Sequence, residues 1–295
     1  MEYLHIFWEV SVGYLNWFLG QLTFRTSDGL WGNYFYFLLL VSLVFFGLEW
    51  IKPWRKDQPK FRLDFWLDAF YMFFNFFLFS IIAFAGLAQV GVQFLSDVLG
   101  YFNIENIVAI QVGSLPAGVQ LLLLFVVKDF IEWLIHRLLH WSPRLWEFHK
   151  VHHSVKQMGF AAHLRFHWME NVIYKSLEYI PLAMIGFSLT DFFLVHAIAI
   201  AIGHWNHANF NVNIGLLKYV FNHPAMHIWH HAKHLPEDRQ AGVNFGLSLS
   251  MWDYLFGTSY VPENGRDIEL GFPEDDNFPS DFIHQNLHGF GVKKK

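Results

Sequence analysis

Four long apolar stretches limit what this chain can fold into. They cover residues 33–51, 65–88, 118–135 and 172–205. A chain inside a bilayer must satisfy its backbone hydrogen bonds internally, and a helical crossing takes about 20 apolar residues. Charged residues make up only 15% of this chain, whereas ~25% is usual for a soluble domain. The pattern predicts an all-α integral membrane protein with about four transmembrane helices.

A basic loop orients the predicted helices. Residues 52–62 contain five Lys or Arg side chains, and short loops with such an excess lie on the cytoplasmic side. The last apolar stretch contains Pro181 and Gly186 and is expected to enter the bilayer and return as a hairpin. The segments that follow residues 135 and 205 then face the cytoplasm, at a bacterial inner membrane or the endoplasmic reticulum.

Three regions are expected along the chain. Residues 1–32 form an N-terminal interfacial segment, because their aromatic residues suit the headgroup region. Residues 33–260 form a membrane-embedded domain. Residues 261–295 form a soluble C-terminal tail that ends in three lysines. No cleavable signal is predicted, since the first residues lack a basic start.

Histidine is concentrated in one part of the chain. Of the 18 histidines, 15 lie between His136 and His234. Three clusters have helical spacing: His136 and His140; His149, His152 and His153; His227, His230 and His231. Residues three or four apart share one face of a helix. Eight imidazoles exceed the needs of one metal ion, so the clusters predict two ions, each with about three or four protein ligands.

The clusters resemble a known family. The segments HRLLH, HKVHHS and HIWHH are similar to the three histidine boxes of the fatty acid hydroxylase superfamily, which includes sterol desaturases and alkylglycerol monooxygenase. The similarity extends to LRFHWME (164–170), HANFN (207–211) and NFGLSLSMWDYLFGT (244–258), and it covers roughly residues 125–260. It implies a cytoplasmic, histidine-rich helical cap holding a dimetal site. It also implies a di-iron monooxygenase that uses O2 to hydroxylate a C–H bond of a sterol, fatty acyl chain or alkylglycerol.

Further site residues are expected around the boxes. The HANFN segment adds His207 as a ninth ligand. Metal-bound imidazoles need a partner for their other nitrogen. Asp129 lies seven residues before His136, on the same helical face, and is expected to accept that hydrogen bond. Asp253 is expected to act in the same way, and Asn244 to shape a turn near the third box. An ordinary salt bridge is the alternative for each acid. Glu132 and Glu170 are further candidates for this role.

The resemblance and the composition together define the expected cofactors and partners. Two Fe ions and O2 are expected, although Zn can replace iron in recombinant protein because imidazole binds both. The chain has no cysteine, which excludes thiolate-ligated haem and cysteine-bound iron–sulfur clusters. No nucleotide-binding motif is present, so electrons are expected from a ferredoxin, a cytochrome b5-like protein or a reduced pterin. The net charge of −5 gives no reason to expect nucleic acid.

Two other functions remain open. A lipid desaturase would use the same di-iron site. A membrane metal-binding or transport protein should place its ligands near the bilayer midplane, whereas these histidines follow the ends of the apolar stretches. A lipid substrate is expected to reach the metals from within the bilayer, between walls that include Phe125, Trp133 and the 172–205 hairpin. The sequence does not name the lipid or the oligomeric state.

Overall fold

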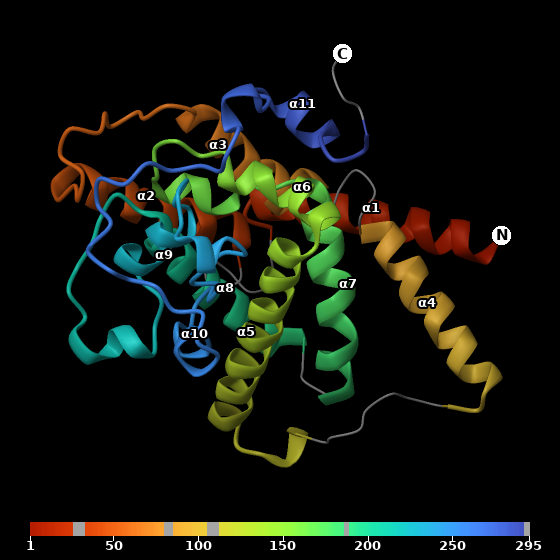
Figure 1. The fold of residues 1–295 in the computed structure, drawn as a ribbon. Coiled ribbons are helices and arrows are strands. Elements are labelled where there is room, and N and C mark those ends of the chain that lie inside the picture. Colours follow the sequence, from red (N-terminus) through yellow and green to blue (C-terminus); the bar gives the residue numbers. More distant parts are fainter. Residues whose placement is uncertain (26–32, 80–84, 105–111, 186–188, 292–295) are drawn as a thin grey trace.

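The computed structural model of the chain describes residues 1–25, 33–79, 85–104, 112–185 and 189–291, and the regular elements in that part are helices joined by turns and loops (Figure 1). The longer helices are α1 (Glu2–Leu22), α2 (Tyr34–Ile51), α3 (Phe65–Phe73), α4 (Ala85–Tyr101), α5 (Ala117–Trp141), α6 (Pro143–His153), α7 (Trp168–Ile185) and α8 (Leu189–His207). The shorter ones are α9 (Pro224–His230), α10 (Met251–Leu255) and α11 (Phe282–Leu287). Only two isolated β-bridges occur among the described residues. The all-α prediction is therefore confirmed.

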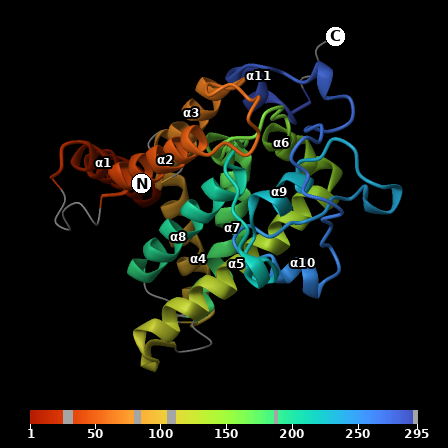
Figure 2. The ribbon, with the colours of Figure 1, turned by 90° about the vertical axis from the view of Figure 1, so that its left-hand side faces the viewer.

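Helix α5 is central to the region that the histidines occupy. α5 packs against α6, α7 and α8, and Leu124, Leu182 and Val195 form a buried apolar cluster between them. In Figure 1, α5 and α7 descend side by side, and α6 lies at the upper end of α5. In the view of Figure 2, α1 and α2 extend to one side of this group, and α9 and α10 lie on the other.

The membrane crossings are described only in part. Among the described residues, α2 is the one helix that is long and apolar enough to cross a bilayer. α5 carries Lys128, Asp129 and Glu132 in its middle, so its apolar run is interrupted. The stretch 65–88 is not one continuous helix, because it passes from α3 into a π-helix (Phe74–Leu78), and α4 begins at Ala85. Residues 80–84, between these helices, lie outside the described residues. The four-crossing arrangement stays a prediction.

Polar side chains inside α3 and the π-helix fix the segment that follows the second histidine cluster. Asp68 is fully buried and is paired with Arg62 and, at 3.1 Å, with Arg165. Asn75, in the π-helix, donates to the backbone carbonyls of Leu164 and Phe166, each at 2.9 Å. Single turns of π-helix within an α-helix are frequent at functional sites. These bonds place residues 164–166 beside the histidines.

The N-terminal segment packs on the same core. α1 is a helix of 21 residues that lies against α4. The contact is close at Gly86, where an added Cβ would lie 2.5 Å from the ring of Phe7. Phe18 packs with Phe77 and Ile200 in a buried cluster. This segment is helical and contributes Phe18 to the core, while its interfacial location stays a prediction.

The C-terminal region covers one end of the helices. Asn286 is buried, donates to the hydroxyl of Tyr71 at 2.9 Å and accepts from the His167 ring at 2.8 Å. Asp275 is paired with Lys156 and, at 3.2 Å, with Lys233. The tail expected to be soluble is thus packed on the rest of the chain up to residue 291. The C-terminal lysines lie outside the described residues.

Candidate metal centre

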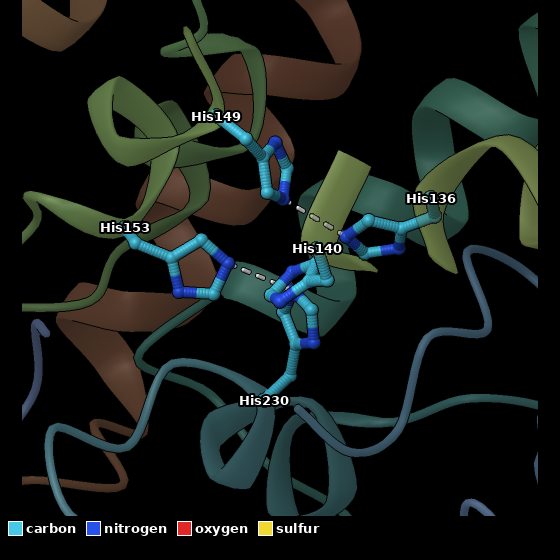
Figure 3. A group of neighbouring side chains, drawn as sticks. All are labelled: His136, His140, His149, His153 and His230. Carbon is cyan, nitrogen blue, oxygen red and sulfur yellow. Dashed lines mark hydrogen bonds between the residues drawn. The ribbon is translucent and has the colours of Figure 1, made fainter. Parts of the chain in front are cut away.

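The structure brings five histidines from three helices into a first group. They are His136 and His140 from α5, His149 and His153 from α6, and His230 from α9, and one ring nitrogen of each lies within 4.8 Å of the others. Figure 3 shows the rings directed toward a common centre. The facing Nε2 atoms are 3.1 Å apart for His136 and His149, and also for His153 and His230.

Four other histidines form a second group: His152 from α6, His207 from α8, His227 from α9 and His231 immediately after α9. Their Nε2 atoms are also close, at 3.3 Å between His152 and His207 and 3.0 Å between His207 and His227. All nine predicted ligands therefore lie in one of two groups. His204 and His167 lie in neither group.

The two groups divide each longer histidine box. His149 and His153, four residues apart, enter the first group, whereas His152 enters the second. His227 and His231, also four apart, enter the second group, whereas His230 enters the first. Side chains four residues apart point in nearly the same direction on a helix, and a residue one position away points elsewhere. One helix can therefore supply ligands to both groups.

The outer nitrogens show what the inner nitrogens can bind. Nδ1 of His152 faces the backbone carbonyl of Arg165 at 3.1 Å, and Nδ1 of His207 faces that of Gly203 at 2.8 Å. A carbonyl only accepts, so each Nδ1 carries the proton, and each Nε2 of the neutral ring presents a lone pair. Two lone pairs facing each other at 3.3 Å repel unless a cation lies between them. This arrangement fits a metal ion.

Burial supports the same protonation state. Removal from water lowers the pKa of His152 to about 3 and lowers the pKa values of His149, His153 and His230 well below the usual range. These rings are therefore neutral at physiological pH, and neutral imidazole is the form that binds metals. In the first group, Nε2 of His140 is also buried without a hydrogen-bond partner. A metal ion would satisfy that nitrogen.

One carboxylate contacts a predicted ligand directly. Glu170, at the start of α7, lies 2.8 Å from Nδ1 of His149. Burial raises the pKa of its carboxyl to about 8. A cation on the far side of the imidazole opposes this effect, because positive charge favours the carboxylate and strengthens the hydrogen bond. Glu170, a secondary candidate by sequence, has the geometry expected of an orienting residue.

A closing loop, residues 243–246, orients two further ligands through its backbone. The carbonyl of Val243 faces Nδ1 of His230 at 2.8 Å, and the carbonyl of Phe245 faces Nδ1 of His136 at 2.7 Å. The pattern of side chains in a sequence does not predict which backbone carbonyls contact an imidazole, because every residue has one. Neither of these carbonyls was predicted from the sequence, and the same is true of the carbonyls of Arg165 and Gly203.

Asn244 and Asp253 hold the closing loop. Asn244 has a left-handed backbone, with φ of 53°, and its amide donates to the carbonyls of Met226 and Tyr260. Asp253 accepts from the backbone N–H groups of Phe245 and Gly246, at 2.9 and 2.8 Å. Asn244 shapes the turn as expected. Asp253 does not bond to a ligand imidazole as predicted, because its oxygens are occupied by the loop's N–H groups.

Asp129 has a different role from the predicted one. Its oxygens accept from the backbone N–H groups of Ser248 and Leu249, at 2.8 and 3.2 Å, and from the indole of Trp252 at 2.9 Å. The nitrogen of His136 that it was expected to bind faces the carbonyl of Phe245 instead. Helical spacing placed Asp129 on the correct side of α5. However, its oxygens are occupied by Ser248, Leu249 and Trp252, which follow the closing loop.

A cavity of about 620 Å³ reaches both histidine groups. At that end it is lined by His136, His149, His152, His207 and His227. Phe125 and Trp133, expected as walls, do not line it, since Trp133 is fully buried and donates to Asp253. Residues of α7 and α8 do line it, and the 172–205 stretch was expected to form part of the wall. Aromatic side chains of α1, α2 and the π-helix region complete the lining.

Comparison with known proteins agrees with this arrangement. Residues 121–258 match the family model described as fatty acid hydroxylase. The chain is 34% identical over 156 residues to ornithine lipid hydroxylase OlsE of Rhizobium tropici, covering 53% of this chain and 46% of that protein. It is 30% identical over 146 residues to alkylglycerol monooxygenase of Homo sapiens, covering 48% and 31%. It is 25% identical over 142 residues to methylsterol monooxygenase 1-2 of Arabidopsis thaliana, covering 47% and 46%.

The family model covers the histidine-bearing region. The chain spans less than half the length of each of these relatives, and no solved structure matches it. The matched residues run from α5 through α10, so they contain all nine histidines of the two groups together with Glu170 and the closing loop. On this evidence residues 121–258, which carry both histidine groups, are similar to the fatty acid hydroxylase family.

Proposed function

We propose that this chain is a membrane-bound di-iron monooxygenase that uses O2 to hydroxylate a C–H bond of a lipid. The observation that carries the proposal is the pair of histidine groups beside one cavity. The proposed reaction inserts one oxygen atom into the C–H bond and releases the other as water. It therefore takes two electrons and two protons from an external donor. A sterol, a fatty acyl chain, an alkylglycerol and an ornithine lipid are all candidate substrates.

The donor set supports two redox-active ions. The first group would bind one ion and the second group another, and bound iron would supply the capacity to bind and reduce O2. All-imidazole sites suit iron, zinc or copper by affinity, and iron is chosen here because lipid hydroxylation needs a redox metal. No cysteine is available to hold an iron–sulfur cluster. A ferredoxin, a cytochrome b5-like protein or a reduced pterin is the proposed electron source.

The chain's own residues position the ligands and exclude water. The carbonyls of Val243 and Phe245 and the carboxyl of Glu170 each fix the tautomer of one imidazole. Such outer partners also raise the basicity of the ligand. The ligand rings of α6 and α9 are almost completely buried, and a dry, preorganised site protects a reactive oxidant from side reactions.

The decisive experiment combines purified protein in lipid vesicles with an electron donor and ¹⁸O2. The expected product is a lipid carrying one ¹⁸O atom as a hydroxyl, identified by mass spectrometry. The same preparation of His230→Gln should give none. An alkene in place of the hydroxyl would instead identify a desaturase. Oxygen entering from water, or no lipid product with any donor, would overturn the proposal.

The proposed topology places the histidine groups on the cytoplasmic side of the membrane. Lys56 is exposed in the basic loop that follows α2, and the chain has no cysteine of its own. A single cysteine introduced by Lys56→Cys should therefore react with a membrane-impermeant thiol reagent only from the cytoplasmic side. Labelling from the opposite side alone would reverse the topology.

A further inference from the structure

The cavity extends from the histidine groups along α8. Residues three or four apart on this helix line it, from His207 back to His196. These two histidines are separated by a rise of roughly 16 Å along the helix axis. At the His196 end, the ring of Phe76 stacks on the imidazole, with 6.0 Å between the centroids. A ligand that starts at the histidine groups and follows α8 therefore reaches an aromatic region.

Helix α1 contributes two aromatic side chains to the cavity. Tyr14 and Trp17 both line it, and their ring centroids are 5.1 Å apart. Phe18 is buried beside them and packs against Phe77, with 5.1 Å between the centroids. Because Phe77 directly follows Phe76 in the π-helix, this contact holds α1 next to the aromatic region.

The opposite face of α1 has different surroundings. Trp8 is 68% exposed, Leu15 and Leu19 are also exposed, and none of the three lines the cavity. Helix α1 is therefore a wall, with the cavity on one face and the outer surface of the molecule on the other. It precedes residues 121–258, so this wall does not belong to the region that matches the family model.

Helices α5 and α7 give the cavity a polar wall. Four ionisable side chains line it there: Lys128 and Glu132 from α5, and Lys175 and Glu178 from α7. Lys128 pairs with both glutamates, with 3.2 Å between its Nζ and Oε1 of Glu178. Two lysines and two glutamates have no net charge when ionised, so this wall does not require a charged ligand. Apolar surface placed against it would remove water from polar groups, which is costly.

The two kinds of wall favour one shape of lipid. An unbranched acyl or alkyl chain is narrow and flexible, so it can follow α8 and lie against the aromatic side chains alone. The fused rings of a sterol are rigid, wider and apolar on both faces, so they would also cover the ionisable side chains. Burial of apolar surface is favourable in proportion to its area. Only the narrow chain obtains this burial without the polar cost.

We propose that the cavity binds a lipid through one unbranched acyl or alkyl chain, that it discriminates against sterols, and that Tyr14 and Trp17 of α1 form the wall that sets this preference. The inference rests on the proposed function for the reaction alone, because binding requires neither O2 nor an electron donor. It retains fatty acyl chains, alkylglycerols and ornithine lipids as candidate substrates, and it removes sterols.

Binding can be measured with two probes that differ in shape. Purified protein in nanodiscs, without an electron donor, is loaded with radiolabelled palmitic acid, which is then displaced by unlabelled palmitic acid or by cholesterol. The wild type should require about a tenfold higher concentration of cholesterol or more, since the apolar contact of one aromatic side chain changes affinity by at least that factor. Equal displacement by the two lipids overturns the proposed preference without any variant.

Two substitutions in α1 locate the preference. Trp17→Ala removes a contact of the chain and widens the cavity, so the ratio of the two displacing concentrations should fall by about tenfold, toward one. Trp8→Ala is the matched control, because it removes the same type of side chain from the outer face of the same helix. It should keep the wild-type ratio. A general loss of structure would weaken both lipids together, so a folded Trp17→Ala protein with the wild-type ratio contradicts the role of α1.

A substitution on α8 tests the same preference in the opposite direction. Ala199→Leu adds volume to a side chain that lines the cavity. The ratio should rise by about tenfold, because a rigid sterol is excluded before a flexible chain when a pocket is narrowed. This variant decides the question even where Trp17→Ala does not fold. A ratio that stays unchanged or falls in Ala199→Leu contradicts the proposal.

The ¹⁸O2 experiment separates this inference from the proposed function. If the preference is observed and depends on Trp17, but no lipid acquires oxygen, the binding site stands and the proposed reaction falls. If ¹⁸O enters a sterol and no lipid with an acyl or alkyl chain, hydroxylation stands and the chain-binding assignment falls.

Discussion

The two histidine groups contain the same kind of ligand but are held by different parts of the chain. In the first group, His136 and His230 donate to carbonyls of the closing loop, which lies more than a hundred residues after α5. In the second group, His152 and His207 donate to the carbonyls of Arg165 and Gly203, which belong to segments next to the cavity. The first group therefore depends on the closing loop, and the second on the segment before α7 and on α8.

This difference teaches how one small domain can support two ions. A neutral imidazole needs a fixed tautomer to present a lone pair, and every acceptor that fixes it must come from a rigid neighbour. The closing loop provides acceptors for His136 and His230, whereas Arg165 and Gly203 provide them for His152 and His207. Each group can therefore be disturbed separately.

The largest expected effect comes from removing a ligand of one group. His207→Gln should reduce the metal content from about two ions per chain to about one, because it takes one of four donors from the second group. His204→Gln, three residues earlier on α8 and outside both groups, should keep both ions. Elemental analysis of the purified proteins measures the number of metal ions per chain. Equal metal content in the two variants would show that His207 is no more a metal ligand than His204.

A smaller effect is expected at the carboxylate that serves the first group. Glu170→Gln keeps the shape of the side chain but weakens the acceptor for the His149 N–H. We expect metal affinity or hydroxylation rate to fall by roughly 10- to 100-fold, as is usual for outer-sphere partners of metal ligands. Competition with a chelator measures the affinity directly. An unchanged affinity and rate would show that the Glu170–His149 contact only joins α6 to α7.

A third substitution tests the closing loop without touching a histidine. Asp253→Asn exchanges one carboxylate oxygen for an N–H₂ group that cannot accept from Phe245 or Gly246. The unfolding free energy should fall by about 1–3 kcal/mol, and the ion of the first group should bind more weakly than that of the second. A stepwise metal titration separates the two ions. Equal weakening of both would mean that the closing loop supports the groups jointly.

The smallest effect on rate is expected at Asp129. This carboxylate holds Ser248, Leu249 and Trp252 but contacts no ligand. Asp129→Asn should therefore lower thermal stability, by about 1–3 kcal/mol in unfolding free energy, while the rate per folded molecule stays close to that of the wild type. Thermal unfolding and turnover, measured on the same preparation, test this. A rate loss as large as that of Glu170→Gln, with normal stability, would restore the role first predicted for Asp129.

The sequence predicted the ligands well because ligand identity is a local property. Histidines three and four residues apart must share a helical face wherever the helix lies, so the eight box residues could be named without coordinates. His207 came from the resemblance, and the structure places it in the second group. The supporting acids were predicted less well, because a helical face says which way Asp129 points but not which segment packs against it.

What the sequence determined by itself is the set of imidazoles and the helices that carry them, since both follow from residue type and short-range spacing. Tertiary packing decided how the set is divided. His152 and His153 are neighbours in sequence yet belong to different groups, because their side chains leave α6 in different directions and the packing of α5, α8 and α9 brings different histidines to each side. Packing also decided that backbone carbonyls orient His136, His152, His207 and His230. Every residue carries a carbonyl, so only the folded chain shows which ones reach an imidazole nitrogen.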